Sequence, residues 1–357
     1  MKIALITDQH FGARGDNIML FRYKSLFYQN VFFPMLKELG ITEVCDLGDT
    51  FDRRKFINFH TLKAAKEMWF EPLRDAGITL HSIVGNHTAY FKNTNEVNTM
   101  DLLFKDYENI RLYASPETVE IDGTKIAMLP WICSGNYEES MNFIKDTPAQ
   151  ILFGHLELNG FEMYRGVVGS THGFERSVFD KFDMVCTGHF HHKSSNGNIH
   201  YLGAPYEMNW SDYDDERGFH ILDTETRELT FIQNPYRLFH KIVYNDVGKT
   251  MDQLVDQDFS QYKDTFVKLI VKHKENPYWF DMVVDKIEAA GVSDLQVVED
   301  NLNLNLEDDS DIVNEAEDTL TIMRKFVEQY ADKNVSDSLN NLLFDLYREA
   351  ITLESQS

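Results

Sequence analysis

Cysteine and long apolar runs are scarce in this sequence. The three cysteines, Cys45, Cys133 and Cys186, are an odd number scattered singly, which argues against a disulfide framework or a zinc knuckle. We therefore expect reduced thiols in the core. No apolar run reaches the roughly 18 residues that span a bilayer, and no basic and apolar leader opens the chain. These absences predict a cytoplasmic protein with no membrane partner.

Positive charge is also in short supply. Lysine and arginine number 34 against 58 aspartates and glutamates, a formal net charge of −24. Such a charge repels nucleic acid at long range, which argues against binding through a generally basic surface. Any phosphate chemistry must therefore rely on local cations, either bound metal ions or a few basic side chains near a site.

Five short apolar runs in the first 190 residues end directly in polar residues. They are strand-length and apolar on both faces, as buried parallel strands are, and helical patterns over residues 20–39 and 59–75 separate the first three. An Asp-Gly pair in VEIDGTKIAML predicts a hairpin, and GFHILDTETRELTFI a looser one. We predict a layered α/β fold with largely parallel pairing. The five runs are KIALIT, TEVCDLG, LHSIVG, QILFG and DMVCTG.

The pattern changes after about residue 235. FVKLIVKH and SDLQVVED are typical of strands and WFDMVVDKIEAAG of an amphipathic helix, so residues 236–298 are predicted to form a small α+β domain. Residues 299–318 hold nine acidic residues and no lysine or arginine, which indicates a solvated linker. Residues 319–357 regain helical periodicity as a helix pair that could dock on this chain or on another protein.

Polar side chains with metal-binding chemistry follow each of the five runs. The carboxyl ends of parallel strands meet in one crevice of an open α/β sheet, so these residues should lie together. Two carboxylates, an asparagine and four imidazoles drawn from these residues are too many for one ion but suit two divalent cations about 3.5 to 4 Å apart with a bridging carboxylate. The residues at the strand ends are Asp8, His10, Asp49, Asp52, Asn86, His87, His155, His189 and His191.

Five segments between residues 8 and 191 carry a family resemblance. DQHFG, GDTFDRR, GNHT, GHLELNG and GHFHH resemble, in order and spacing, the motifs of the calcineurin-like metallophosphoesterases. Within that family the chain is most similar to the SbcD-type nucleases of double-strand-break repair, and among these to members from T-even phages. The resemblance implies a metallophosphoesterase sandwich over residues 1–235, a capping domain over 236–298, and an ATPase-binding region over 319–357.

The resemblance also implies roles for the strand-end residues. Asp49 would bridge two divalent ions, with manganese the expected metal. His87 would stabilise the phosphorane or protonate the leaving oxygen, and Asp52 would orient its neighbours. The other implied ligands are Asp8, His10 and His191 for one ion, and Asn86, His155 and His189 for the other.

The function implied is that of a DNA nuclease in recombination, repair and replication. It would act as an exonuclease on duplex ends and an endonuclease on single strands or hairpins, in the host cytoplasm if phage-encoded. Its partner would be an SbcC-type coiled-coil ATPase bound through the C-terminal helices. A homodimer is also implied, and residues 20–39 fit either its interface or ordinary core packing. A phosphatase or small phosphodiesterase, and a scaffold whose chemistry has decayed, remain as alternatives.

Several other residues near the motifs are ambiguous or atypical. Basic residues beside the second and last motifs either contact a DNA backbone or form solvated loops. Trp131 is interpreted as a core residue, and His172, His200 and His220 as non-ligands. The basic set is Arg53, Arg54, Lys55, His192 and Lys193.

Thr88 departs from the family pattern, which usually has aspartate after the GNH sequence. An aspartate there would orient the catalytic histidine and support its charged form. Threonine can still accept a hydrogen bond, but it supplies no charge. We therefore expect an intact metal site with weaker or pH-shifted activity.

Overall fold

The computed structural model describes residues 1–168 and 173–299. His172, most of the predicted acidic linker and the predicted helical region 319–357 lie outside these residues. No helix within the described part of the chain is long and apolar enough to cross a membrane.

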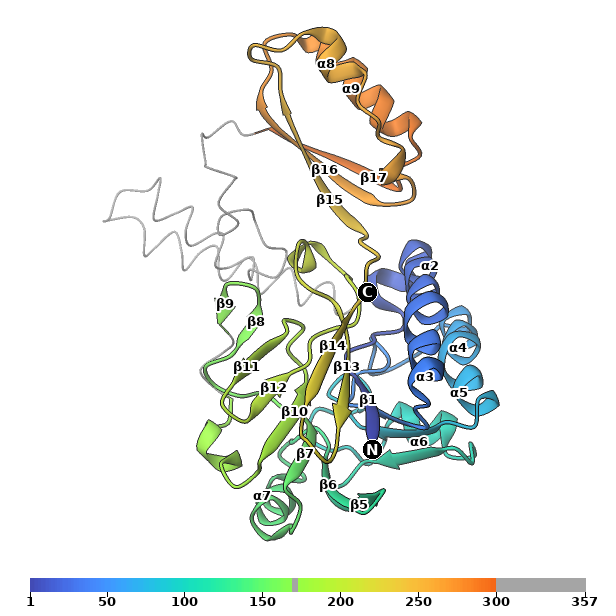
Figure 1. Cartoon of the computed structure of the whole chain (residues 1–357), viewed down its shortest axis with the longest axis vertical. Helices are drawn as coiled ribbons and strands as arrows, with labels where there is room; N and C mark the ends of the chain where they lie inside the picture. Colours follow the sequence, from blue (N-terminus) through green and yellow to red (C-terminus); the bar gives the residue numbers. More distant parts are fainter. Residues whose placement is uncertain (169–172, 300–357) are drawn as a thin grey trace, which may run out of the picture. The chain divides into compact units, whose positions relative to one another are not determined.

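Two six-stranded sheets lie within the first 235 residues (Figure 1). The first has the order β14-β13-β1-β2-β3-β4, with β1 to β4 parallel to one another and β13 and β14 each antiparallel to its neighbour. Its strands are β1 (Lys2–Ile6), β2 (Glu43–Asp46), β3 (Thr79–Ile83), β4 (Ile110–Tyr113), β13 (Gly218–Asp223) and β14 (Leu229–Gln233).

The second sheet has the order β11-β12-β10-β7-β6-β5. Its four inner strands are parallel and its two edge strands antiparallel. The predicted hairpin joins β5 to β6 through Asp122 and Gly123, both with positive φ (48° and 75°). Its strands are β5 (Glu117–Ile121), β6 (Thr124–Leu129), β7 (Ile151–His155), β10 (Met184–Gly188), β11 (Ser194–Asn196) and β12 (Ile199–Tyr201).

All five apolar runs are strands, but they do not share one sheet. The first three become β1, β2 and β3, while the last two become β7 and β10 of the other sheet. Alternate residues point to opposite faces of a strand, and Ile3 and Leu5 of β1 join Ile151 and Phe153 of β7 in one buried cluster. The sandwich that the family resemblance implied is confirmed, and the strand ends that carry the candidate ligands belong to two sheets of it.

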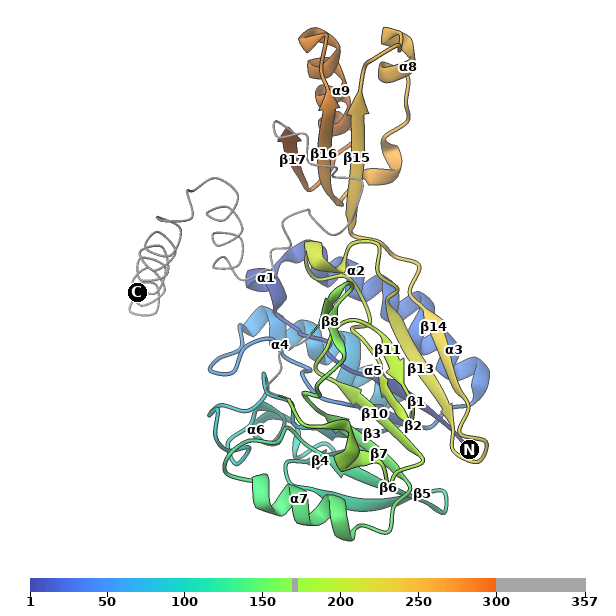
Figure 2. The same cartoon turned by 90° about the vertical axis from the view of Figure 1, so that its left-hand side faces the viewer.

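Helices cover the outer faces of the sandwich (Figures 1 and 2). Helices α2 to α5 lie on the first sheet, and α7 packs Ile144 into the cluster on the outer face of the second. All three cysteines are buried free thiols, as predicted. The helices are α1 (Ala13–Asp16), α2 (Ile18–Phe27), α3 (Phe33–Leu39), α4 (Phe59–Ala65), α5 (Glu71–Asp75), α6 (Thr99–Phe104) and α7 (Tyr137–Asp146).

The two long helices predicted from the sequence are each interrupted by one π-helical segment. These segments, Tyr28–Phe32 and Lys66–Phe70, precede Pro34 and Pro72. Proline lacks an amide hydrogen and its ring clashes with the carbonyl four residues earlier, so a wider turn accommodates it. In the first helix Phe21, Phe27 and Phe32 are buried, which is ordinary core packing for these three rings.

A third sheet follows in the chain, with the order β15-β16-β17. Strands β15 and β16 are parallel, and a separate buried cluster joins Val267 and Leu269 of β16 to Val283 and Ile287 of α9. The elements are β15 (Phe239–Asn245), α8 (Met251–Val255), β16 (Phe266–His273), α9 (Pro277–Ala289) and β17 (Asp294–Glu299). Small elements elsewhere are β8 (Glu162–Tyr164), β9 (Val167–Val168) and the 3-10 helices Arg176–Phe179, Trp210–Asp212 and Ser260–Tyr262.

Candidate metal centre

Left-handed backbone marks the strand ends that carry the candidate ligands. Asp8 (φ 52°), His10 (φ 43°), Asp49 (φ 54°) and His189 (φ 90°) follow β1, β2 and β10. This conformation is unfavourable for residues with a side chain and persists where the surroundings impose it, often at functional sites. The turns aim successive side chains into one region between the two sheets.

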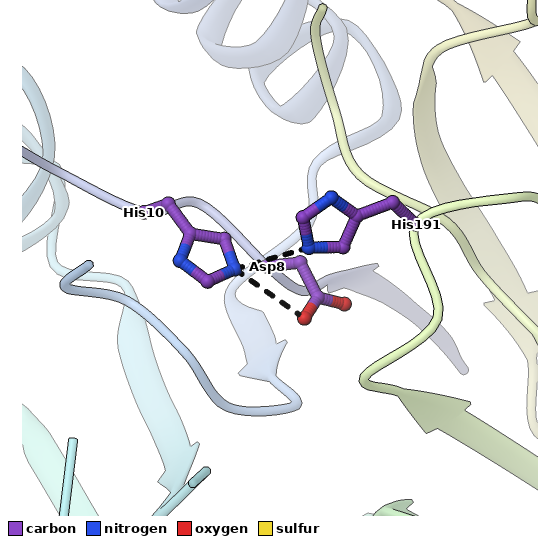
Figure 3. Close-up of side chains that lie close together, drawn as sticks. All are labelled: Asp8, His10 and His191. Carbon is purple, nitrogen blue, oxygen red and sulfur yellow. Dashed lines mark hydrogen bonds and ion pairs between the residues drawn. The ribbon is translucent and has the colours of Figure 1, made fainter. Parts of the chain in front are cut away.

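Asp8, His10 and His191 form the first cluster, here called the His191 group (Figure 3). Nε2 of His10 lies 3.2 Å from Nε2 of His191 and 3.8 Å from a carboxylate oxygen of Asp8. On the other side of the ring, Nδ1 of His10 is 3.4 Å from Oδ1 of Asp52. A carboxylate behind a histidine fixes the ring and leaves its other nitrogen for a metal, so Asp52 sits where an orienting residue is expected.

Asn86, His155 and His189 form the second cluster, the His155 group. Oδ1 of Asn86 lies 3.0 Å from Nε2 of His155 and 3.1 Å from Nδ1 of His189. Nδ1 of His155 is 2.7 Å from the carbonyl oxygen of Leu47. Because a carbonyl only accepts, Nδ1 of the neutral ring carries the hydrogen and Nε2 has a free lone pair.

Asp49 lies between the two groups. Its Oδ2 is 3.2 Å from Nε2 of His155 and 3.9 Å from Nε2 of His10, while its Oδ1 accepts a hydrogen bond of 2.7 Å from the amide of His87. This is the position that a carboxylate bridging two cations requires. Asp49, His10 and His155 are all buried.

Two glycines allow the strand ends to approach this closely. A Cβ atom on Gly85 would lie 2.2 Å from Oδ1 of Asp49, and one on Gly188 would lie 1.9 Å from Oγ1 of Thr7. Neither distance leaves room for a side chain. Glycine at these positions is therefore a packing requirement of the site.

The electrostatics of the cluster favour neutral imidazoles at His189 and His191. Burial, and then the nearby His155, lower the pKa of His189 to about 3, and burial followed by His10 lowers the pKa of His191 well below its usual value. Burial disfavours ionised Asp49, but the charge and hydrogen bond of His155 outweigh it and hold the Asp49 pKa low. For His155, burial is outweighed by Asp49, which raises its pKa to about 9. A bound cation would displace that proton.

His87 is fixed by main chain and not by its neighbour in sequence. Nδ1 of His87 lies 2.5 Å from the carbonyl oxygen of Asp52, so Nδ1 carries the hydrogen and Nε2 remains for proton transfer. The Thr88 hydroxyl is buried and turned toward Gly85, accepting from its amide at 3.0 Å and donating to its carbonyl at 3.1 Å. The structure therefore gives Thr88 the role of closing the turn, and the predicted tuning of His87 needs revision.

The interpretation of Trp131 as a core residue was wrong. Its ring is only partly buried, with its centroid 5.0 Å from that of His189 and 6.2 Å from that of His155. It belongs to the rim of the candidate site and not to the core. The residue follows β6, whose end carries no polar ligand, so no pattern in the sequence placed it there.

The predicted DNA-contacting residues are largely engaged with other groups. Nη1 of Arg53 pairs with Asp16 at 2.9 Å, and Nη1 of Arg54 reaches the carbonyl of Ala89 at 3.5 Å. Lys55 is exposed. The later pair is held by acids, with His192 2.9 Å from Asp215 and Lys193 2.7 Å from Glu216. His200 bonds to Ser195, and His220 packs against Phe231; both are outside the two clusters.

Comparison with known proteins finds relatives of the same part of the chain. The family model for the calcineurin-like phosphoesterases matches residues 1–193, the part that carries every candidate ligand. This chain belongs to the calcineurin-like phosphoesterase family. Exonuclease subunit 1 of Enterobacteria phage T4 is 34% identical over 353 residues, covering 98% of this phosphoesterase and 99% of the relative. The SbcD component of the nuclease SbcCD from Staphylococcus epidermidis is 25% identical over 233 residues, 59% of each chain.

The donor set of this phosphoesterase fits a dinuclear metal centre. Imidazole, carboxylate and amide donors are the ligands of divalent transition metals. The Nε2 atoms of His10 and His191 converge to 3.2 Å, and Nδ1 of His191 is buried without a hydrogen-bond partner. The two facing Nε2 atoms would both be ligands of a cation bound near them.

Proposed function

We propose that this phosphoesterase is a DNA nuclease that uses two divalent metal ions, with manganese the preferred metal. The position of Asp49 between the His191 and His155 groups carries the proposal. The His191 group with Asp49 would hold one ion, and the His155 group with Asp49 the other. Similarity to an exonuclease subunit over almost the whole chain favours DNA over a small phosphoester or a phosphoprotein as the substrate.

The protein's own contribution to the chemistry is positioning and proton transfer. When bound, the two ions supply Lewis-acid polarisation of the scissile phosphoryl group and activation of water. His87 lies beside this centre, with its ring centroid 4.9 Å from that of His10. Because Nδ1 is committed to the Asp52 carbonyl, Nε2 is the atom that would stabilise the phosphorane or protonate the leaving oxygen.

The remaining parts of the chain are assigned roles by the same proposal. The sheet of β15, β16 and β17 is a capping domain that shapes DNA access, within predicted bounds of residues 236–298. Residues 299–318 are a linker, and residues 319–357 bind an SbcC-type coiled-coil ATPase. Both relatives are named as subunits, which supports a partner of this kind. A homodimer through the phosphoesterase domain completes the proposed assembly.

A substrate comparison tests the proposal. We expect the full chain with manganese to degrade end-labelled linear duplex DNA and to cut single-stranded or hairpin DNA, more strongly with the ATPase partner present. Asp49→Asn removes the bridging charge at nearly constant volume and should abolish cleavage. Asp106→Asn, an exposed acid near α6, is the matched control and should retain it. Efficient turnover of p-nitrophenyl phosphate without DNA cleavage would contradict a nuclease and favour a phosphatase.

A further inference from the structure

Two buried basic side chains stand directly behind the His191 group. Lys24 of α2 and Arg217, the residue before β13, are each 1% exposed. Burying a charge is unfavourable unless hydrogen bonds or opposite charges compensate. The partners that each side chain has therefore indicate what the buried charge does.

Lys24 is bonded to the loop that carries Asp8 and His10. Its Nζ donates to the carbonyl of Gln9 at 2.8 Å and to the carbonyl of His10 at 2.6 Å. The Nζ atom also faces the rings of Phe11 and Tyr206, 5.0 Å and 4.8 Å from their centroids. Burial lowers the pKa of Lys24 from 10.5 to about 7. Both of these hydrogen bonds go to main-chain oxygens, and the amino group can donate both whether or not it is charged, so Lys24 acts on the loop's backbone.

That backbone is the strained part of the site. Asp8 and His10, on either side of Gln9, both have left-handed φ values of 52° and 43°. An amino group that binds the carbonyls of Gln9 and His10 together stabilises this turn against the relaxed alternatives that an Asp or His residue prefers. Lys24 thereby fixes the direction in which Asp8 and His10 point.

Arg217 holds the opposite ligand in the same way. Its Nη1 donates to the carbonyl of His191, and its Nη2 donates to Asp212 at 2.8 Å and Asp215 at 2.9 Å. The two carboxylates fix the guanidinium, and the guanidinium fixes the main chain of His191. The two histidines whose Nε2 atoms face each other at 3.2 Å are thus each bonded, at the carbonyl, to a buried basic side chain.

We propose that Lys24 and Arg217 are positioning residues that preorganise the His191 group for its metal ion. The inference rests on the proposed two-metal function and adds a selective effect to it. Loss of either side chain should weaken binding of the ion at the His191 group more than binding of the ion at the His155 group. The reason is that His155 is oriented by the carbonyl of Leu47 and by Asp49, which neither side chain touches.

Manganese affinity measured in two backgrounds tests this selectivity. His155→Ala leaves the His191 group as the intact site, and His191→Ala leaves the His155 group. Calorimetric titration of the full chain with manganese then gives one affinity for each group. Lys24→Met should lower affinity about tenfold or more in the first background, as loss of a supporting hydrogen bond does. In the second background the loss of affinity should be smaller.

Matched variants separate positioning from general damage. Lys37→Met, on the exposed face of α3, should leave both affinities unchanged. Arg217→Lys keeps a cation and should retain more affinity at the His191 group than Arg217→Met. Lys24→Gln, which keeps an N–H donor, serves if Lys24→Met does not fold. Equal weakening of both groups, or of neither, would overturn the positioning role. Fewer than two ions bound by the wild type would instead overturn the proposed function.

Discussion

The two ligand groups differ in how their side chains are held. The His191 group depends on side chains brought from elsewhere, since Lys24 and Arg217 bind the carbonyls of its histidines. The His155 group depends on main chain and close packing, through the Leu47 carbonyl and the absence of a side chain at Gly85. Substitutions of Lys24 or Arg217 should change the support of the His191 group by degrees. At Gly85, a single added methyl group already collides with Asp49.

The largest effect is expected from Gly85→Ala. The new methyl would lie 2.2 Å from Oδ1 and 2.6 Å from the amide nitrogen of Asp49, so the bridging carboxylate must move. A displacement of about 1 Å at reacting groups can lower the rate about 100-fold. The rate of manganese-dependent DNA cleavage by the variant measures this loss. Gly77→Ala, where the added Cβ meets open space, should lose some stability and keep its activity. Full activity of Gly85→Ala would show that packing does not hold this side of the site.

The next largest effect is expected from substitution of Asp46, at the end of β2, and this residue makes the free energy of unfolding depend on pH. Burial raises its pKa from 3.8 to about 7, despite a hydrogen bond of 2.5 Å from Thr50. The native state therefore binds more protons than the unfolded state between these values, and stability falls as pH rises through this window, by about 1.4 kcal/mol per pH unit.

Asp46→Asn removes this dependence. Its gain in the free energy of unfolding over the wild type should grow between pH 5 and pH 7 and then level off, as measured by urea unfolding of metal-free protein. A gain that does not change with pH would show that Asp46 titrates normally. Burial of the Asp46 carboxylate next to the His155 group would then cost the folded protein little.

Thr88 is expected to affect stability more than rate. Thr88→Val keeps the shape and removes both hydrogen bonds to Gly85, which should cost about 1 to 3 kcal/mol. Thr88→Asp, the family residue, cannot donate to the Gly85 carbonyl when ionised, and His87 already has the Asp52 carbonyl. We expect a less stable variant with an unchanged pH profile of cleavage. A faster enzyme with a shifted profile would restore the idea that residue 88 tunes His87.

The smallest effect is expected from Tyr206→Phe, which alters the support of the His191 group. The Tyr206 hydroxyl donates to the Gln9 carbonyl at 2.6 Å, an oxygen that Lys24 also binds. Because one donor remains, the loss should be about 1 kcal/mol of stability, with a smaller fall in manganese affinity than in Lys24→Met. An effect larger than that of Lys24→Met would make the tyrosine, and not the lysine, the main support of the loop.

The sequence indicated the candidate ligands but not the residues that support them, for a physical reason. Strand-length apolar runs ending in Asp, His or Asn are local patterns, so β1, β2, β3, β7 and β10 and their terminal residues could be found without a structure. The pairing of those strands into two sheets is long-range and leaves no local sign. Pro34 and Pro72 did carry a local sign of a helix irregularity, which periodicity alone overlooked.

Lys24, Arg217 and Trp131 could not have been placed in this way. Lys24 falls within an amphipathic helical pattern, where a lysine normally indicates a solvated face. Only the fold shows that α2 turns this side chain toward the carbonyls of Gln9 and His10. Trp131 follows a strand with no ligand of its own, and its contact with His189 depends on the neighbouring strands. Residues that support a site can be found only from tertiary packing, whereas candidate ligands can be found from residue type and position at strand ends.

Electron paramagnetic resonance of the manganese-loaded full chain tests the central claim most directly. If Asp49 bridges two ions, the wild type should bind two manganese ions and give the spectrum of an exchange-coupled pair. Asp49→Asn should lose that coupling, while Asp106→Asn keeps it. A single uncoupled manganese ion in the wild type at saturation would contradict the two-metal centre.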